Sequence, residues 1–388
     1  MNQDKINNMR FNTKTIHGGQ EQTDPAYGSV MPPIYQTSTY AQSTPGGHKG
    51  YEYSRSGNPT RTALEKSLAN LENGNYGLAF GSGLAAIDAV LKLFEPGDEI
   101  ISTNDLYGGS YRLFTRIFEK MGIKFHFVGM QEAGDIENYI TPNTKLIWLE
   151  TPSNPMMNIT DIEAVTRIAK KHGVLVAADN TFASPYLQRP LDLGADIVMH
   201  SATKYLGGHS DVVLGGLVVR DKVLYQKLYF IQKASGAIPG PQDCFLVLRG
   251  IKTLHLRMQR HCENGEAVAK FLRSHPGIDQ VYWPGFDDHP NHDIAKRQMS
   301  GFGGMLSFTT KEGSLNSATK IVEKLKIFTL AESLGGVESL AGHPASMTHA
   351  SIPREERQKT GVVDSLIRLS VGVEDIEDLL EDLKQAIG

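Results

Sequence analysis

The chain has 388 residues, of which 40% are hydrophobic and 21% charged, and its formal net charge is -4. This length and composition are typical of a globular protein with room for two domains, each with its own hydrophobic core. The lack of any basic block argues against nucleic acid as a partner, and the lack of an apolar run of about 18 residues argues against a membrane span.

The cysteine content and the N-terminal residues indicate a reducing compartment. The two cysteines, Cys244 and Cys262, are too few for a disulfide framework, and the sequence contains no C-x-x-C motif. Residues 1–12 are polar and contain no apolar stretch of the kind found in signal peptides. We therefore expect a cytoplasmic protein. The densest histidine cluster, residues 289–293, lacks metal-ligand spacing, so no metal is expected.

Residues 1–56 form the first predicted unit, an extended N-terminal arm. This segment is rich in Gly, Pro, Thr, Ser and Tyr, has no strong periodicity, and is too long for a simple loop inside one compact domain. We expect it to pack on its own domain or on a neighbouring subunit. Near its end, Tyr53 and Arg55 alternate along extended chain and so point to one side. Arg55 could bind a phosphate through a bidentate contact, or Tyr53 and Arg55 could simply anchor the arm.

Residues 57–255 alternate between helix and strand patterns. The expected helices are 60–71, 84–94, 111–121 and 162–172, and the expected strands are 99–102, 124–128, 145–149, 174–178, 195–198 and 215–219. Short apolar strands between amphipathic helices indicate an α/β domain with a mainly parallel sheet and helices on both faces.

Residues 256–388 alternate less regularly and suit a smaller α+β domain at the C-terminus. The expected elements are a long helix over 256–274, strands over 304–309 and 366–371, and a C-terminal helix over 376–387. No internal repeat and no low-complexity segment interrupts either domain.

Two side chains at strand ends carry the main chemical signal. Lys204 follows the strand 195–198, with the hydroxyls of Ser201 and Thr203 three residues and one residue before it. Asp179 ends the strand 174–178. A lysine in such a place can hold an aldehyde cofactor as a Schiff base, and an acid can keep a pyridine nitrogen protonated so that the ring accepts electrons. Together they suit pyridoxal 5'-phosphate, although each alone could be an ordinary surface lysine or a helix-capping acid.

The loop Gly81-Ser82-Gly83 joins an apolar segment to a helix and suits a phosphate, because a helix N-terminus favours an anion. The same residues, continued to Ala86, also fit the loose dinucleotide fingerprint G-x-G-x-x-A. That fingerprint requires an acid at the end of the next strand, about 20 residues on. Asp98 and Glu99 come instead at the start of that strand. A nicotinamide-dependent dehydrogenase and a purely structural glycine turn both stay open as alternatives.

Three further features complete the list of candidates. Tyr107 follows the strand 99–102, where an aromatic ring can stack on a planar cofactor. Arg368 lies in mid-strand between apolar neighbours and needs an anionic partner, either an amino-acid carboxylate or an internal acid. The loop 330–336 is rich in small residues and could line a substrate cleft.

Taken together, these motifs resemble the Cys/Met-metabolism branch of the fold-type-I pyridoxal-phosphate enzymes. The resemblance extends from about residue 15 to the C-terminus. The motifs that carry it are YSRSGNPT (53–60), SGL (82–84), YGG (107–109), DNTF (179–182), SATKY (201–205), ESLG (332–335) and RLS (368–370). The resemblance implies the fold of the PLP-dependent transferases and pyridoxal phosphate as the cofactor.

The resemblance also implies roles for single residues. Lys204 would bind the cofactor aldehyde, Asp179 would pair with the pyridine nitrogen, and Thr181 would support the cofactor near Asp179. Tyr107 would stack on the ring and take part in proton transfer. The expected phosphate contacts are Gly83, Leu84, Ser201 and Thr203, and the expected substrate contacts are Arg368, Ser333, Glu332 and Tyr53. Tyr53 and Arg55 would reach the cofactor phosphate of a neighbouring subunit, which implies a homotetramer built from two dimers.

Within the family, the chain looks most like the transsulfuration lyases that eliminate at the γ-carbon of L-cystathionine and release L-cysteine, 2-oxobutanoate and ammonia. Glu332 stands where lyases that cleave at the β-carbon usually have an apolar residue, and it could meet the distal ammonium group of cystathionine. Gly109 stands where methionine γ-lyases usually carry cysteine. The alternative is the synthase reaction, which joins an O-acylated homoserine and cysteine. In either case we expect Lys204 to move protons, with its pKa lowered near Arg368.

Overall fold

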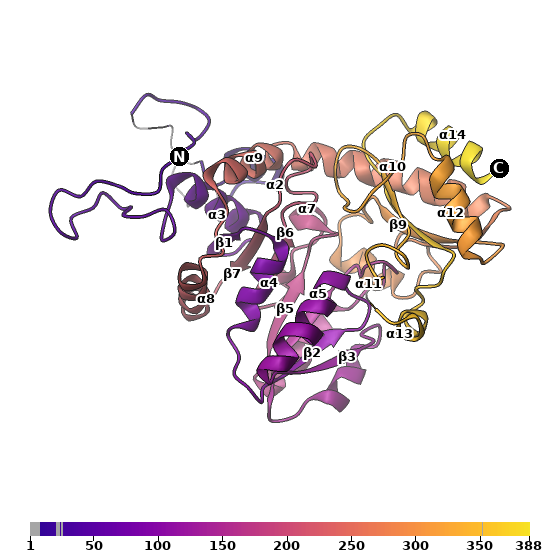
Figure 1. Cartoon of the computed structure of the whole chain (residues 1–388), viewed down its shortest axis with the longest axis horizontal. Helices are drawn as coiled ribbons and strands as arrows, with labels where there is room; N and C mark the ends of the chain where they lie inside the picture. The colour runs from indigo at the N-terminus through magenta and orange to yellow at the C-terminus, as the bar shows by residue number, and fades with distance from the viewer. Residues whose placement is uncertain (1–7, 21–23, 25, 351) are drawn as a thin grey trace.

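The computed structural model of the chain describes residues 8–20, 24, 26–350 and 352–388. Two sheets organise these residues (Figure 1), one of seven strands and one of five. The predictions for the polar N-terminus and for the first part of the arm fall partly on residues 1–7, 21–23 and 25, and to that extent lie outside the described residues.

The larger sheet is mainly parallel, as the sequence predicts. Its strand order is β1-β7-β6-β5-β4-β2-β3, where β6, β5, β4, β2 and β3 pair in parallel and β7 runs antiparallel to both β1 and β6. The strands are β1 (Tyr76–Phe80), β2 (Glu99–Thr103), β3 (Lys124–Val128), β4 (Thr144–Glu150), β5 (Leu175–Asp179), β6 (Ile197–Ser201) and β7 (Gly215–Val219). The prediction of an α/β fold is therefore confirmed.

Helices cover both faces of this sheet because the strand side chains alternate between two apolar faces. In β4, Leu146 and Trp148 pack into a core with α4 and α8, whereas Ile147 and Leu149 pack into another with α6. The helices of the first face are α4 (Gly83–Leu91), α5 (Gly108–Leu113) and α8 (Lys222–Ser235), and those of the second are α3 (Pro59–Leu71), α6 (Ile162–His172) and α9 (Pro241–Ile251).

Side-chain caps fix where several of these helices begin. Asn58 accepts from the backbone N–H groups of Thr60 and Arg61 at the start of α3. Ser82 and Asp161 do the same for α4 and α6, each through a bond from the N–H three residues on. Such bonds satisfy N–H groups that have no partner within the helix. The start of α4 at Gly83 places a helix N-terminus beside the glycine loop.

The predicted helix over 111–121 differs from the structure. Here α5 begins earlier, at Gly108, and is followed by a π-helical turn (Phe114–Phe118) and a 3₁₀ turn (Glu119–Met121) that ends at Gly122. The two glycines resemble a turn in the sequence, but they allow a close approach: a Cβ on Gly108 would lie 2.2 Å from the carbonyl oxygen of Thr348. Strand β1 and helices α8 and α9 were not predicted either, since β1 contains a glycine and neither helix has a clean apolar stripe.

The smaller sheet has the order β10-β11-β12-β9-β8, antiparallel except where β10 meets β11. The strands are β8 (Ile278–Tyr282), β9 (Met305–Thr310), β10 (Thr329–Leu330), β11 (Leu340–Gly342) and β12 (Leu366–Ser370). Helices α10 (Leu254–Ser274), α12 (Leu315–Lys324) and α14 (Ile376–Ile387) pack on it around a separate core. The domain boundaries at 56 and 255 stay predictions; the second falls in the first turn of α10.

Short elements complete the two parts. They are α7 (Ser184–Leu187), α11 (His292–Gln298), α13 (Arg354–Lys359) and the 3₁₀ turns Ala133–Tyr139 and Pro190–Leu193. Among the described residues, no helix is both long and apolar enough to cross a membrane.

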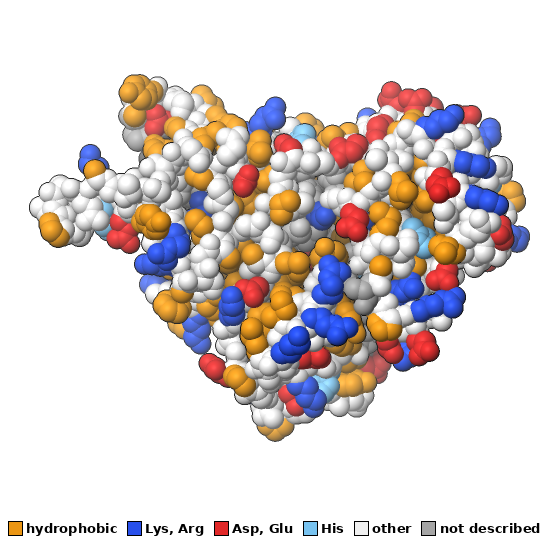
Figure 2. Space-filling view, in the orientation of Figure 1, with side chains coloured by type: hydrophobic (Ala, Val, Ile, Leu, Met, Phe, Trp, Pro, Cys, Tyr) orange, Lys and Arg blue, Asp and Glu red, His pale blue; other side chains and the backbone are white. Residues whose placement is uncertain are grey.

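The arm stands away from the rest of the chain. It is less irregular than expected, because α2 (Phe11–His17) is helical and docks on α3 and α10. Residues 26–56 are largely extended and project as an indigo loop (Figure 1), in which an isolated bridge joins Thr39 and Tyr53. Figure 2 shows hydrophobic side chains on this projection, and Tyr27 and Val30 are 95% and 85% exposed.

One buried carboxylate in α14 fixes the chain before β10. Asp382 accepts bonds from the backbone N–H groups of residues 326, 327 and 328 at 2.8, 2.8 and 3.0 Å. Burial raises the pKa of Asp382, but these bonds together outweigh burial, so the pKa lies below its ordinary value. The stabilisation is therefore present at neutral pH and is lost only as the pH falls through the lowered pKa.

We expect Asp382→Ala to lower the free energy of unfolding by roughly 2–4 kcal/mol, because it leaves three backbone N–H groups without an acceptor. Urea denaturation followed by circular dichroism at pH 7 measures this change. Asp378→Ala, an exposed change in the same helix, is the matched control and should stay within about 0.5 kcal/mol. Equal effects of the two changes would contradict the role assigned to Asp382.

Candidate active site

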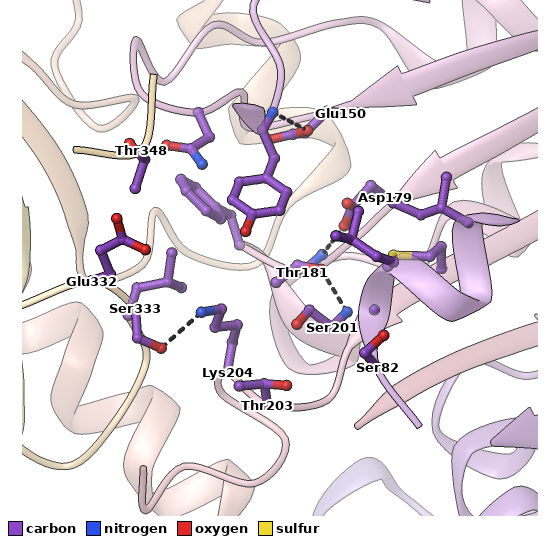
Figure 3. Close-up of a pocket in the computed structure, with 18 of the residues that line it drawn as sticks. Ser82, Glu150, Asp179, Thr181, Ser201, Thr203, Lys204, Glu332, Ser333 and Thr348 are labelled. Atoms are coloured by element: carbon purple, nitrogen blue, oxygen red, sulfur yellow. Dashed lines mark hydrogen bonds between the residues drawn. The ribbon is translucent and has the colours of Figure 1, made fainter. Parts of the chain in front are cut away.

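A cavity of about 380 Å³ opens at the carboxyl ends of β4, β5 and β6. Parallel strands end at one edge of a sheet, so the residues that follow them converge there. The loop that carries Glu332 and Ser333 lines the opposite side of the cavity (Figure 3). Arg368 on β12 also lines it. The structure brings together these predicted residues: Gly83, Leu84, Tyr107, Asp179, Thr181, Ser201, Thr203, Lys204, Glu332, Ser333 and Arg368.

Lys204 points into the cavity from the loop after β6. Its Nζ donates to Ser333 Oγ at 2.7 Å (Figure 3). Burial lowers the pKa of Lys204 to about 8, with Arg368 acting in the same direction and Glu332 opposing it. At neutral pH a useful fraction of the amine is therefore free of its proton and can act as a nucleophile or a base.

The loop that carries Lys204 is fixed from behind by α10. Arg257 donates from Nη1 to the carbonyl oxygen of Tyr205 at 2.7 Å and from Nη2 to that of Gly250 at 2.8 Å. The fit is close, because a Cβ on Gly208 would lie 2.1 Å from Arg257 Nη1. The backbone next to the lysine is therefore held by a buried cation from the second half of the chain.

Asp179 ends β5 and is 8% exposed. Its Oδ1 accepts from the backbone N–H of Thr181 at 3.0 Å, and Thr181 Oγ1 in turn accepts from the N–H of Ser201 at 2.9 Å (Figure 3). Burial raises the pKa of Asp179, while the Thr181 bonds and the nearby His200 favour the ionised form. A buried acid so held suits a cationic partner in the cavity.

The glycine loop forms a narrow cradle at the start of α4. A Cβ on Gly83 would lie 3.1 Å from Cβ of Ser201, so a larger residue would fill the space between them. Gly215 allows the loop to approach β7, since a Cβ there would lie 2.1 Å from the carbonyl oxygen of Ser82. The first-turn N–H groups of a helix of this length, together with hydroxyls opposite, suit a phosphate.

The dinucleotide alternative fails on topology. That fingerprint belongs to the first parallel βαβ unit of a nucleotide-binding sheet. Here β1, which precedes the glycine loop, is the edge strand and pairs antiparallel with β7. The loop therefore does not lie at the crevice between parallel strands that a dinucleotide requires.

Arg368 on β12 is 4% exposed. Its Nη1 donates to Asn154 Oδ1 and its Nη2 to the carbonyl oxygen of Ser333, each at 2.9 Å. Burial lowers its pKa to about 10, so the guanidinium stays charged. Both acceptors are neutral, and Arg368 makes no salt bridge within the described part of the chain. Its charge is therefore available to an anion in the cavity, as the amino-acid carboxylate interpretation requires.

Sequence reasoning missed several cavity residues. The polar ones are Glu150, Asn154 and Thr348, and the apolar ones are Ile87, Met199 and Val213. Glu150 ends β4 in register with Asp179 at the end of β5, so the strand-end reasoning that found Asp179 could have found it. Thr348 lies on an irregular segment, and no local pattern marks it.

Tyr53 and Arg55 are the predicted residues that the structure does not bring to this cavity. Arg55 Nη1 donates to the carbonyl oxygen of Lys233 in α8 at 2.9 Å, and its Cζ lies 5.6 Å from the centre of the Tyr53 ring. Tyr53 is 44% exposed. Within one chain the pair thus anchors the arm, and the role toward a neighbouring subunit stays a prediction.

Comparison with known proteins gives consistent matches over the whole chain. The family model for Cys/Met metabolism PLP-dependent enzymes matches residues 12–388. A cystathionine β-lyase of Coxiella burnetii is 53% identical over 97% of this chain and 97% of its own length. A cystathionine γ-lyase of Bacillus subtilis is 53% identical over 98% and 99%. Among solved structures, cystathionine γ-lyase from Lactobacillus plantarum, in complex with L-serine, has a TM-score of 0.94 at 49% identity and covers 97% and 98%.

A second solved structure, metB from Corynebacterium glutamicum, has a TM-score of 0.96 at 48% identity and covers 98% of each chain. At such coverage the similarity extends over both sheets. Both parts of the fold, and the connection between them, are therefore shared with these proteins.

The lowered pKa of Lys204 predicts a pH-dependent reactivity. In protein free of any cofactor, labelling of Lys204 by a small amine-reactive reagent should rise with pH and reach half its maximal rate near pH 8, because only the neutral amine reacts. Mass spectrometry of the labelled peptide gives the rate at each pH. A lysine in a short model peptide, with a pKa of about 10.4, is the control; identical profiles would contradict the assignment.

Proposed function

The chain belongs to the Cys/Met metabolism family of PLP-dependent enzymes, and from this premise we propose that it converts L-cystathionine to L-cysteine, 2-oxobutanoate and ammonia by α,γ-elimination. It is a PLP-dependent carbon–sulfur lyase, and the predictions of the fold, the family and the cofactor are confirmed. The nicotinamide alternative is wrong. The observation that supports amino-acid chemistry at this site is a cavity that holds a partly neutral lysine and a buried arginine, which makes no salt bridge within the described residues. The choice of the γ-carbon is based on Glu332, as argued below.

The residues of the cavity fit pyridoxal phosphate. The cradle between Gly83 and Ser201 would hold the phosphate, the buried carboxylate of Asp179 would meet the pyridine nitrogen, and the amine of Lys204 would bind the aldehyde. When bound, the cofactor supplies an electron sink for the charge that develops at the α-carbon of an amino acid. Leu84, Thr203 and Thr181 line the same region, and the ring of Tyr107 stands across the cavity.

Lys204 is the group we propose to move the protons. Its pKa of about 8 lets it accept a proton at Cα and return one later near neutral pH. Ser333 Oγ, 2.7 Å from Nζ, holds the amine toward the interior of the cavity. A single flexible amine can thus serve Cα and Cβ in turn, which γ-elimination requires.

Arg368 and Glu332 are proposed to orient the two ends of the substrate. Arg368 would bind the α-carboxylate, with Asn154 fixing the guanidinium. Glu332 is exposed at the mouth of the cavity and would meet the distal ammonium of cystathionine. Because exposed ion pairs contribute only about 0.2–1 kcal/mol, Glu332 would favour cystathionine over shorter amino acids only modestly.

Elimination at the β-carbon is the second candidate function, because relatives named for it are equally similar. The cystathionine β-lyase of Lactococcus lactis is 55% identical over 97% of this chain. That reaction uses the same proton removal at Cα and would release pyruvate, homocysteine and ammonia. Glu332 is the feature of this chain on which we base the choice of the γ-carbon. The synthase reaction would use the same residues with an O-acylated homoserine and cysteine.

A homotetramer of two dimers is also proposed. The arm projects from the chain and exposes Tyr27, Val30 and Tyr53, a surface that a second copy would bury. Tyr53 and Arg55 on the arm would then reach the phosphate cradle of the neighbouring subunit. A cytoplasmic location is a further proposal, supported by the two unpaired cysteines, Cys244 and Cys262.

Purified protein loaded with pyridoxal phosphate should release 2-oxobutanoate from L-cystathionine in excess over pyruvate, as measured by chromatography of the two ketoacids. An excess of pyruvate would support β-elimination instead. Turnover of an O-acylated homoserine with cysteine that exceeds both would support the synthase reaction. Lys204→Ala should lower turnover by about 10²–10⁴-fold or more, because it removes the proton-transferring group. Lys227→Ala, an exposed change on α8, is the control and should leave turnover unchanged.

The shared-site proposal predicts complementation between inactive variants. If Arg55 serves the neighbouring subunit, unfolding and refolding a mixture of Arg55→Ala and Lys204→Ala should restore about one quarter of the sites, since random pairing places both defects in one site of each mixed dimer. Turnover per subunit measures the recovery, and light scattering gives the assembly size. Refolding each variant separately is the control. If the mixture recovers no turnover, Arg55 does not serve the site of the neighbouring subunit and the shared-site proposal is wrong.

A further inference from the structure

The peptide unit between Leu106 and Tyr107 is held at both of its polar ends. The N–H of Tyr107 donates to Glu150 Oε2 at 2.9 Å (Figure 3). The carbonyl oxygen of Leu106 faces His349 Nε2 at 3.3 Å. The two side chains come from distant parts of the sequence, one from the end of β4 and the other from the irregular segment 343–350. They meet the same peptide from opposite sides.

The hydrogen bonds of His349 place a proton on Nε2. Its Nε2 faces two carbonyl oxygens, those of Leu106 and of Asn154 at 3.2 Å, and carbonyls only accept, so Nε2 must carry the proton. Burial, with Arg368 nearby, lowers the pKa of His349 to about 4, which leaves the ring neutral. Nδ1 then accepts from the hydroxyl of Thr348 at 2.8 Å. His349 is 2% exposed, and both of its nitrogens are satisfied.

Glu150 holds the other end of the peptide regardless of its own charge. It is 4% exposed. Burial and the adjacent Asp179 raise its pKa well above the ordinary value, with Asp105 acting in the same direction and Arg368 opposing. A carboxyl group can accept the bond from Tyr107 N–H whether it is neutral or ionised. A glutamine in this position would therefore keep the bond, and a leucine would remove it.

The segment that carries His349 lies directly on the turn that carries Tyr107. The approach of Gly108 to Thr348, described above, leaves no room for a side chain. His349 also contacts the backbone of Asn154, whose side chain holds Arg368. One buried imidazole therefore touches both the turn under the aromatic ring and the loop behind the carboxylate anchor.

We propose that Glu150 and His349 are positioning residues that clamp the Leu106–Tyr107 peptide from both sides and so fix where the ring of Tyr107 stands in the cavity. Neither residue needs to touch the substrate. This inference rests on the proposed function for its importance, because Tyr107 is the ring expected to lie against the cofactor. It adds a link from the C-terminal part of the chain to that ring.

The test uses a double-mutant cycle with Tyr107 and needs no substrate. In full-length protein, His349→Ala and Glu150→Leu should each weaken pyridoxal-phosphate binding about tenfold and change the visible circular dichroism of the bound cofactor. In a Tyr107→Ala background the same two changes should have no further effect, because the ring they position is gone. Glu150→Gln and His349→Gln, which keep an acceptor and a donor, should restore the dichroism signal.

His343→Ala is the matched control. His343 is also buried, lies in the same segment, and bonds through Nε2 to the carbonyl oxygen of Asp364 at 2.8 Å. Its replacement should lower the melting temperature without changing the dichroism of the cofactor. The clamp is wrong if His349→Ala weakens cofactor binding equally with and without the Tyr107 ring, or leaves the dichroism unchanged. If His349→Ala does not fold, the same measurements on Glu150→Leu, which removes the hydrogen bond at the other end of the peptide, test the proposal.

The outcome is separable from that of the proposed reaction. Cofactor affinity and dichroism are measured without cystathionine, so failure to cleave cystathionine leaves this test intact. Conversely, if the protein cleaves cystathionine but neither His349→Ala nor Glu150→Leu changes the dichroism, the proposed function stands and the clamp proposal is wrong.

Discussion

Parallel pairing of β4, β5 and β6 is the constraint on which the site depends. Because parallel strands in adjacent βα units end at the same edge, Glu150, Asp179 and Ser201 are brought side by side although long stretches of sequence separate them. Lys204 follows from the same geometry, since the loop after β6 must cross that edge. The antiparallel β7 then closes the sheet beside the loop, and its glycine lets the phosphate cradle approach. The chemistry of the cavity is thus set first by strand direction and only then by side-chain identity.

Two carboxyl groups and a guanidinium group, those of Glu150, Asp179 and Arg368, are buried around this cavity. Burying an unpaired ion costs on the order of several kcal/mol, and the cavity contains a buried arginine without a salt bridge beside two neighbouring carboxyls. Within the described chain, neutral oxygens and backbone N–H groups stabilise these groups only in part. A bound amino acid and a phosphorylated cofactor carry the opposite charges, so the same groups that lower stability in the free protein favour binding.

Much of this could be predicted from the sequence, and the reason is local. Strand-end residues such as Asp179 and Lys204 follow apolar runs that are visible in the sequence, and β3, β7, α6 and α14 were predicted with the bounds that the structure has. Glu150 has the same signature, because it ends β4 opposite Asp179, but the predicted strand 145–149 ends one residue before it. The contacts of His349 could not be predicted, since its partners include backbone carbonyls more than 190 residues away in the chain. The early start of α5 at Gly108 also depends on a distant residue, because Thr348 packs directly against Gly108.

The attachment of the Lys204 loop to α10 has a mechanical consequence. Arg257, in the first turn of α10, donates hydrogen bonds to the backbone beside the lysine and beside α9, and it packs so closely on Gly208 that a side chain there would not fit. A rotation of one sheet against the other would have to break both bonds of this buried guanidinium at once. The two bonds of Arg257 therefore oppose any movement of the start of α10 relative to the backbone beside Lys204.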